Sequence, residues 1–409
     1  MRKLLLVALV MLVAGISSCK KSSKEDEKDD NPFELGYSNL TTEEHKKDLE
    51  QAGLEFVREF NGLPEEPSIK ALNYLSTLGF SFDNEIKSLS NVLAISNHAA
   101  NKNVAGILAT VNNNDVNKLS DFYGIYKWNA SKSDWDEESS TSKLEFRFPS
   151  AENKNTNNAI LTLSYVKDKD YTINDERVEF PKTSTATLTV DGKSELTWTT
   201  SHEYKADGTP TKANVSITIG SFVLTSNTTN NGSNVHSGFA LKKGAKQLLA
   251  ASLSGESTAT VTNFNNEDDI ENLIKNGNAS FEIMNYKFQG QANIKEIIKE
   301  INGISGSGAG KKEAAVWNKH AQFVAINTRD NSLIAKVEFQ GSDDRNCYPY
   351  SIWDNNQNKY VVQEYCWDDS SVEPLLVFKD GSKQSIDAFV ENGFNKIIDE
   401  LESLIERFD

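Results

Sequence analysis

The sequence predicts an α+β fold, with a large antiparallel β-meander, an N-terminal helical region and a C-terminal packing helix. Three observations predict this class: apolar residues recur at helical spacing near both ends, they alternate with polar residues in the middle, and short turn-like segments interrupt the alternation. The chain has 409 residues, of which 38% are hydrophobic. That length suits two or three domains or one large β-rich unit.

Helices are expected over residues 33–103. Thr41 and Glu44 fit a capping box that opens a first helix, and Pro67 suits the first turn of a second, which Gly79 could end. A third helix is expected to follow in the same region. The apolar positions on the three stripes are Leu49, Ala52, Phe56, Phe60, Ile69, Leu72, Leu75, Ile86, Leu89 and Leu93. Stripes of this kind indicate faces that pack on a core.

Residues 104–302 are expected to form the antiparallel sheet with short helices. Asp191-Gly192 separates two alternating runs and predicts a tight hairpin, and Asp207-Gly208 suits another connection. The expected strands include Thr185–Val190, Glu195–Tyr204, Lys212–Leu224, Val235–Leu241, Gln247–Leu253 and Ser280–Phe288. A short helix is expected after Asn266, and another carries Ile294, Ile297, Ile298 and Ile301. Consecutive strands with short turns imply a meander with one apolar face.

The C-terminal part divides into a linker at 303–312, rich in Gly and Ser, and a hairpin-and-helix region at 313–409. The stretch Glu313–Asn327 fits helix and strand equally well. Strands are expected at Leu333–Phe339 and Leu375–Phe378. A final amphipathic helix starts near Ser385, with Ile386, Phe389, Val390, Ile397, Leu401, Leu404 and Phe408 on one side.

The cysteines Cys347 and Cys366 lie in two β-forming runs joined by a turn-like DNNQNK segment. If Trp353 faces Tyr360 across this loop, the same register puts Cys347 directly opposite Cys366. The sulfurs are then within bridging reach, provided the pair is a non-hydrogen-bonded one. The sequence therefore predicts a hairpin stapled by a disulfide.

The N-terminus has the three-part layout of a secretory signal. Arg2 and Lys3 precede an apolar run from Leu4 to Ile16, which is too short to cross a bilayer. Small residues and then Cys19 follow, so residues 1–18 resemble a bacterial lipoprotein leader, with Ile16 where Leu is usual. The resemblance implies cleavage before Cys19 and acylation of its thiol and amine. Two or three acyl chains would anchor the protein firmly.

Residues 19–32 contain no apolar side chain after the cysteine and carry a dense mixed charge run, so they predict a solvated tether. The combination with Cys19 resembles exported lipoproteins of the Bacteroidota, and implies an address in the outer membrane, with exposure at the cell surface left open. The formal charge of −16 becomes −18 when the leader takes away Arg2 and Lys3. Such an acidic body repels nucleic acid, so the expected partners are the membrane, through the anchor alone, and a glycan or protein ligand.

Aromatic residues on the cysteine hairpin are the candidate ligand-binding site. In the predicted register Tyr348 faces Tyr365, with Tyr350 on the same face, while Trp353 and Tyr360 share the other face with the disulfide. Such rings could stack on sugars or anchor a protein partner. The favoured alternative is that one of the two faces is core.

A second aromatic hairpin is expected at Phe122–Trp135, where Trp128 pairs with Trp135. Its rings, too, could either bind a ligand or pack on the core. Together with Lys143–Pro149 it resembles stretches of uncharacterised Bacteroidota lipoproteins, which implies no activity.

Signatures of catalysis, metal binding and cofactor binding are not found. The histidines, at positions 45, 98, 202, 236 and 320, have no zinc-binding spacing, and the chain lacks a G-x-S-x-G elbow. Ser305–Lys312 lacks both end residues of a phosphate loop, and Asp354–Asn358 opens like a calcium loop but continues with Lys359 where Gly is needed. No cofactor, metal ligand or catalytic residue is assigned.

Three functions remain open. A non-catalytic envelope lipoprotein that binds a glycan or protein, or acts as a scaffold, is favoured. The alternatives are a carrier of lipids or other hydrophobic ligands, with the meander curled around a pocket as in envelope lipid chaperones, and a hydrolase that uses carboxylates such as those of Glu267–Glu271 and Ser342–Arg345.

Overall fold

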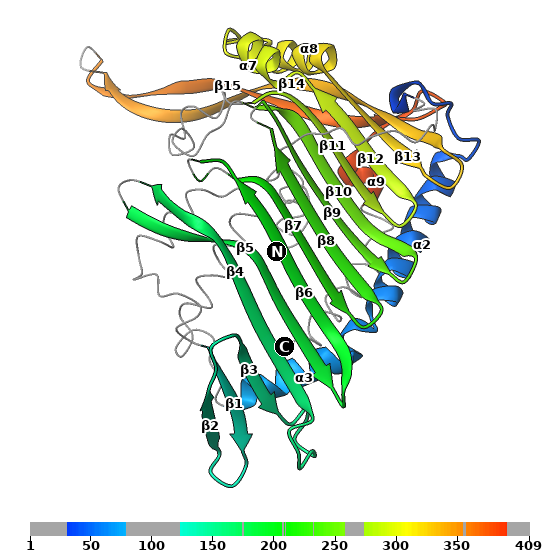
Figure 1. The fold of residues 1–409 in the computed structure, drawn as a ribbon. Helices are drawn as coiled ribbons and strands as arrows, with labels where there is room; N and C mark the ends of the chain where they lie inside the picture. The colour runs from blue at the N-terminus through cyan, green and yellow to red at the C-terminus, as the bar shows by residue number, and fades with distance from the viewer. Residues whose placement is uncertain are drawn as a thin grey trace.

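The computed structural model describes residues 31–78, 123–257 and 274–390, apart from short gaps at 174–175, 207, 209, 232 and 355–356. Its centre is one 16-stranded sheet in which neighbouring strands follow each other along the chain from β3 to β16 (Figure 1). All pairs along that run are antiparallel, and only β1 lies parallel to its neighbour β3. The predicted α+β meander is confirmed.

The strands are β1 (Gly124–Asn129), β2 (Asp134–Ser139), β3 (Leu144–Phe148), β4 (Ala159–Ile173), β5 (Glu176–Val190), β6 (Lys193–Tyr204), β7 (Pro210–Ile219), β8 (Phe222–Asn230), β9 (Asn234–Lys243), β10 (Lys246–Ser257), β11 (Ile274–Ile283), β12 (Tyr286–Ala292), β13 (Ala321–Asn327), β14 (Ser332–Asp354), β15 (Lys359–Val377) and β16 (Lys383–Ser385). The helices are α2 (Thr42–Phe60), α3 (Pro67–Thr77), α7 (Ile294–Ile301), α8 (Ala309–His320) and α9 (Ile386–Val390), with 3-10 turns η1 (Pro32–Glu34) and η2 (Leu63–Glu65).

One face of the sheet is covered by helices in three places. Helix α3 packs on β3, β4 and β5 around Leu75, and α2 packs on strands from β8 to β15 around Leu49. Helices α7 and α8 pack on Phe323 and Phe339 at one end of the strands (Figure 1). Cross-strand partners share a face, and Leu188 of the α3 core lies in line with Phe222 of the α2 core through β6 and β7. The helices therefore bury one continuous apolar face.

The other face of β13 and β14 is covered by the segment around η1. Phe33, Leu35 and Tyr37 pack against Val324 and Leu333. Tyr37 also forms a parallel bridge with Leu333, so this short segment adds to the sheet at its C-terminal strands.

Local signals were confirmed where the turn chemistry is strong. Thr41 and Glu44 form both hydrogen bonds of a capping box, with the Thr41 amide 2.7 Å from a Glu44 carboxylate oxygen. Asp191 and Gly192 form the β5–β6 turn, both at positive φ, as a type I′ turn requires. Helix α7 spans the four predicted isoleucines.

Three sequence-based expectations need correction. The strand expected at Ser280–Phe288 is two strands, β11 and β12, joined at Met284, which adopts a positive φ. The strand expected at Lys212–Leu224 is likewise two strands, β7 and β8, joined at Gly220, which has a positive φ. Helix α8 begins at Ala309, inside the segment predicted as a linker, because its first turn packs closely against β14.

The ambiguous stretch at 313–327 contains both a helix and a strand, since α8 ends at His320 and β13 begins at Ala321. The leader, Cys19 and most of the tether, the third helix, the helix after Asn266, Asp207 and the final helix beyond Val390 lie outside the described residues.

Candidate functional site: an exposed aromatic arm

Strands β14 and β15 form the longest pairing among the described strands and extend beyond the rest of the sheet (Figure 1). Their register runs without interruption from Lys336 opposite Val377 to Asp354 opposite Lys359. Strand β13 pairs with β14 only as far as Lys336, and β16 pairs with β15 only from Leu375 to Val377. The part between Ser342 and Ser371, called the aromatic arm below, is therefore a two-stranded ribbon.

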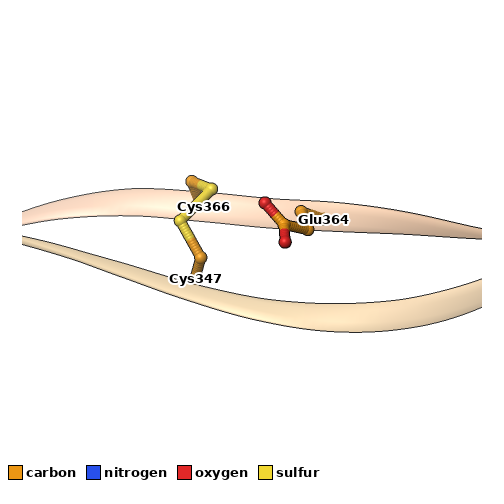
Figure 2. Close-up of side chains that lie close together, drawn as sticks. All are labelled: Cys347, Glu364 and Cys366. Carbon is orange, nitrogen blue, oxygen red and sulfur yellow. A yellow bond between two sulfur atoms is a disulfide. The ribbon is translucent and has the colours of Figure 1, made fainter.

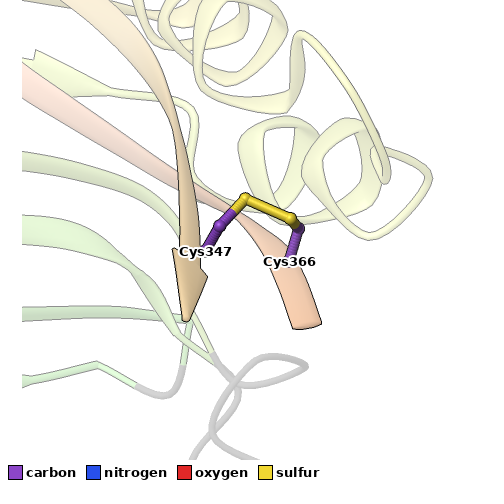
Figure 3. Close-up of a disulfide and its surroundings, with 2 residues drawn as sticks. All are labelled: Cys347 and Cys366. Carbon is purple, nitrogen blue, oxygen red and sulfur yellow. A yellow bond between two sulfur atoms is a disulfide. The ribbon is translucent and has the colours of Figure 1, made fainter. Parts of the chain in front are cut away.

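The predicted register of the arm is confirmed. Cys347 lies opposite Cys366, Tyr348 opposite Tyr365, and Trp353 opposite Tyr360. The two cysteines form a disulfide that joins the strands, with their Cα atoms 4.1 Å apart (Figure 3). Closure of a loop of this size contributes about 3 kcal/mol in the chain-entropy model, which matters because an isolated two-stranded hairpin is only marginally stable in water.

Glu364 lies beside the disulfide on the same face of the ribbon (Figure 2). Its carboxylate and the two sulfurs lie within 4.8 Å of one another, and among the described residues this is the one cluster with three potential metal-binding groups. The thiolate is the form of cysteine that binds metal, and a disulfide sulfur is not a thiolate. The oxidised arm therefore offers a carboxylate and no metal centre.

Three tyrosines lie on one face of the arm. Tyr348 is 51% exposed, and Tyr350 and Tyr365 are exposed as well. The Tyr348 ring is 5.7 Å from the Tyr365 ring across the ribbon and 6.2 Å from the Tyr350 ring along the strand, at interplanar angles of 50° and 53°. The Tyr350 hydroxyl donates a 3.0 Å hydrogen bond to the Gln363 side chain. The rings thus form a cluster held in defined orientations.

The opposite face is also exposed. Trp353 and Tyr360 meet edge to face, with ring centroids 5.1 Å apart and an interplanar angle of 73°. Tyr360 is 70% exposed and Val362, next to it on this face, is 71% exposed. The alternative favoured from sequence, that one face is core, is wrong. Helices α7 and α8 cover only the base of the ribbon, so neither face of its outer part is buried.

The second aromatic hairpin behaves differently. Trp128 and Trp135 face each other in β1 and β2, with ring centroids 5.5 Å apart. Both are partly buried against the α3 core, and Trp135 also packs on Phe146. In this hairpin the two tryptophans therefore pack on the core and do not form an exposed binding face.

The Ser305–Lys312 segment and three of the histidines have structural roles. The Ser305–Lys312 segment leads into α8, and the Asp343 carboxylate accepts a 2.9 Å hydrogen bond from the Gly310 amide at the helix N-terminus. A protein carboxylate thus satisfies the amide that a phosphate would need. His320 bonds the Glu300 carboxylate at 2.9 Å, and His45 and His202 are buried with lowered pKa values because burial disfavours their charged forms.

Sequence reasoning missed Val362 and Ile352, which are exposed apolar residues of the arm. Alternation along a strand could have assigned them to faces, but it could not have shown that both faces meet solvent. Two clefts lined by described residues lie away from the arm: one of about 440 Å³ beside Phe33 and Lys336, and one of about 330 Å³ beside Asn293 and His320.

No family model matches the chain, and comparisons with curated proteins and with solved structures find no significant match. Within the described part of the chain, no helix is both long and apolar enough to span a bilayer.

Proposed function

We propose that this protein is a non-catalytic binding module of the cell envelope that contacts a partner protein through the aromatic arm. The observation that carries this proposal is the exposure of large apolar side chains on both faces of one stapled ribbon. Soluble proteins rarely leave such residues clustered in solvent, and aromatic side chains are favoured anchors at protein interfaces.

Ring geometry favours a protein over a glycan. A sugar chain stacks on rings whose faces lie parallel to its own apolar faces, whereas neighbouring rings of the arm are inclined by 50° to 73°. A protein surface can accommodate inclined rings in separate pockets. The two-sided arrangement also fits a groove that encloses the ribbon better than a ligand laid on one face.

The cellular location of the protein is part of the proposal. The lipoprotein-like leader and the charged tether after Cys19 support acyl anchoring at the outer membrane, with the folded part held in the aqueous phase next to it. Anchoring at a membrane restricts the protein to partners present at that surface.

Photo-crosslinking in the native envelope tests partner binding. With p-benzoylphenylalanine at position 360, we expect a discrete adduct with another protein; with the same group at Val166, an exposed apolar residue of β4, we expect none. The partner is then identified by mass spectrometry.

Tyr348→Ala combined with Trp353→Ala should weaken binding of the purified partner at least tenfold. Equal adducts at both positions, or binding to a glycan array that depends on these rings, would contradict the proposal.

Detergent partition tests the anchor separately. The full-length protein should enter the Triton X-114 phase, and Cys19→Ala should move it to the aqueous phase, because the acyl chains provide the membrane affinity. Recovery of the unchanged protein in the aqueous phase with its leader attached would show that the anchor is absent.

A further inference from the structure

The hydrogen-bonding directions of the arm follow from the disulfide. In an antiparallel pair, opposite residues alternate between hydrogen-bonded pairs about 5.5 Å apart and non-hydrogen-bonded pairs about 4.5 Å apart. The Cα distance of 4.1 Å assigns Cys347 and Cys366 to the second kind. Because the register is uninterrupted, every second residue from each cysteine directs its amide and carbonyl away from the partner strand, to the edge of the ribbon.

An independent contact confirms this assignment. Phe339 lies an even number of residues from Cys347 on the same strand, so its amide and carbonyl should point to the outer edge of β14. There the Asn318 side chain accepts from the Phe339 amide and donates to its carbonyl, both at 2.7 Å.

The two edges of the arm differ. On β14, Asn318 occupies the edge at Phe339, and Pro349 stands at an outward position where it has no amide to offer. Proline at such a position leaves the internal ladder intact and blocks pairing on the outside. On β15, no proline occurs from Lys359 to Glu373, and β16 covers only Leu375–Val377. Among the described strands, β15 therefore presents an unobstructed edge along the arm.

The charge of the arm indicates the chemistry of what would bind there. Between Asp343 and Glu373 the chain carries seven carboxylates and only two basic residues, Arg345 and Lys359. Carboxylates of like sign repel one another, so this excess gives the arm an unbalanced negative charge. A cationic partner would offset this repulsion.

We propose that the open edge of β15 accepts an extended segment of the partner protein as an added antiparallel or parallel strand, and that this segment alternates basic and apolar residues. Backbone hydrogen bonds to the outward groups of Tyr360, Val362 and Glu364 provide affinity, and the exposed aromatic and valine side chains on the two faces contact the alternate side chains of the added strand. This inference rests on the proposed function and specifies how the arm binds.

The experiment measures binding of a fluorescent decapeptide, (Lys-Val)5, to the full chain by anisotropy at low salt. Glu364→Pro removes one amide that points to the outer edge, because residue 364 lies two residues from Cys366, and it leaves the hydrogen bonds between β14 and β15 intact. Glu364→Ala is its matched control. We expect at least a tenfold loss of affinity for Glu364→Pro and less than threefold for Glu364→Ala. (Glu-Val)5 should bind at least tenfold more weakly than (Lys-Val)5. Two further forms of (Lys-Val)5 carry N-methyl groups on the valines or on the lysines; the form whose blocked amides face β15 should bind at least tenfold more weakly, and the other form should keep its affinity, because alternate amides of a strand point to opposite sides.

Binding of (Lys-Val)5 that is equal in Glu364→Pro and Glu364→Ala, or absent from the unaltered protein, would overturn the edge inference. Equal binding of (Glu-Val)5 would overturn its charge requirement. The aromatic variants separate this result from the broader proposal: if Tyr348→Ala with Trp353→Ala loses the crosslinked partner while Glu364→Pro retains it, the arm binds by its faces alone. Intact disulfide, shown by thiol titration, confirms that Glu364→Pro leaves the arm assembled.

Discussion

At the level of single residues, His202 on β6 is the most unusual buried group. It is 2% exposed, and neither ring nitrogen has a hydrogen-bond partner within the described residues. The nearby hydroxyls of Thr200 and Ser184, which lie opposite each other on β6 and β5, are also buried without partners. Because burial penalises the charged imidazolium, the pKa of His202 falls to about 4.

This pKa predicts acid destabilisation at moderately low pH. The unfolded chain takes up the proton near pH 6.5 and the folded chain only near pH 4, so stability is retained above pH 6.5 and lost as the pH falls towards 4. Linkage gives a loss of about 2 kcal/mol between pH 7.5 and 5. Urea unfolding at the two pH values should show this loss in the unaltered protein and a smaller one in His202→Gln.

Thr200→Val provides the control for the histidine. It removes an unpartnered hydroxyl at nearly constant volume and should stabilise the fold by about 1 kcal/mol at both pH values. An identical pH dependence in the unaltered protein and His202→Gln would contradict the role of the histidine.

At the level of elements, the contact between α8 and β14 depends on two glycines. A Cβ atom at Gly341 would overlap the carbonyl of Gly310, and one at Gly310 would overlap the carbonyl of Ser342. The helix thus lies directly on the strand, which fixes the base of the arm. This close approach is a tertiary property, and for that reason the local composition suggested a linker where a helix begins.

Gly341→Ala should therefore destabilise the protein by about 2 kcal/mol, since the backbones must separate to make room. Gly36→Ala is the matched control, because no atom lies within 4 Å of its added Cβ and its φ is not positive; its effect should stay within about 0.5 kcal/mol. Chemical unfolding measures both. A similar small effect for the two variants would show that α8 can move away from β14 at little cost.

The disulfide should stabilise the arm rather than the sheet. With Cys347→Ser and Cys366→Ser together, loss of about 3 kcal/mol would raise the open population of the ribbon roughly 100-fold. Chymotrypsin cleavage near Tyr360 should accelerate accordingly, while the thermal midpoint of the sheet stays unchanged. Equal cleavage rates with and without the disulfide would mean that the ribbon is stable by itself.

The arm also shows which features local sequence can predict. Its register followed from the turn and the two cysteines, because pairing in a hairpin is fixed by nearby residues. Its exposure did not follow, because burial depends on whether distant elements reach the ribbon. The β11–β12 turn was missed for a different reason: Met284 and Asn285 lack the Gly or Pro that usually mark a turn.

At the level of the whole molecule, alternation and turn residues predicted the meander well, since each strand pairs with its neighbour in sequence. They could not predict that all described helices pack on one face, or that β14 and β15 continue past the sheet. The core clusters formed by the described residues contain no residue from the outer part of the arm. The proposed partner contact therefore uses a part of the chain that is separate from these cores.

This separation predicts that the arm can be removed without loss of the fold. Replacing Arg345–Asp368 by Asn-Gly joins Asp344 to Asp369, which already lie opposite each other as a hydrogen-bonded pair, and such a pair can be closed by a two-residue turn. Asp343 is kept because it bonds the first turn of α8. The thermal midpoint should change by less than about 3 °C, because a domain of this size shifts by that amount only for a loss near 1 kcal/mol. The shortened protein should retain membrane anchoring but form no partner adduct. A large fall in the midpoint would place the arm in the cooperative core, and its exposed rings would then have to be explained by folding rather than by binding.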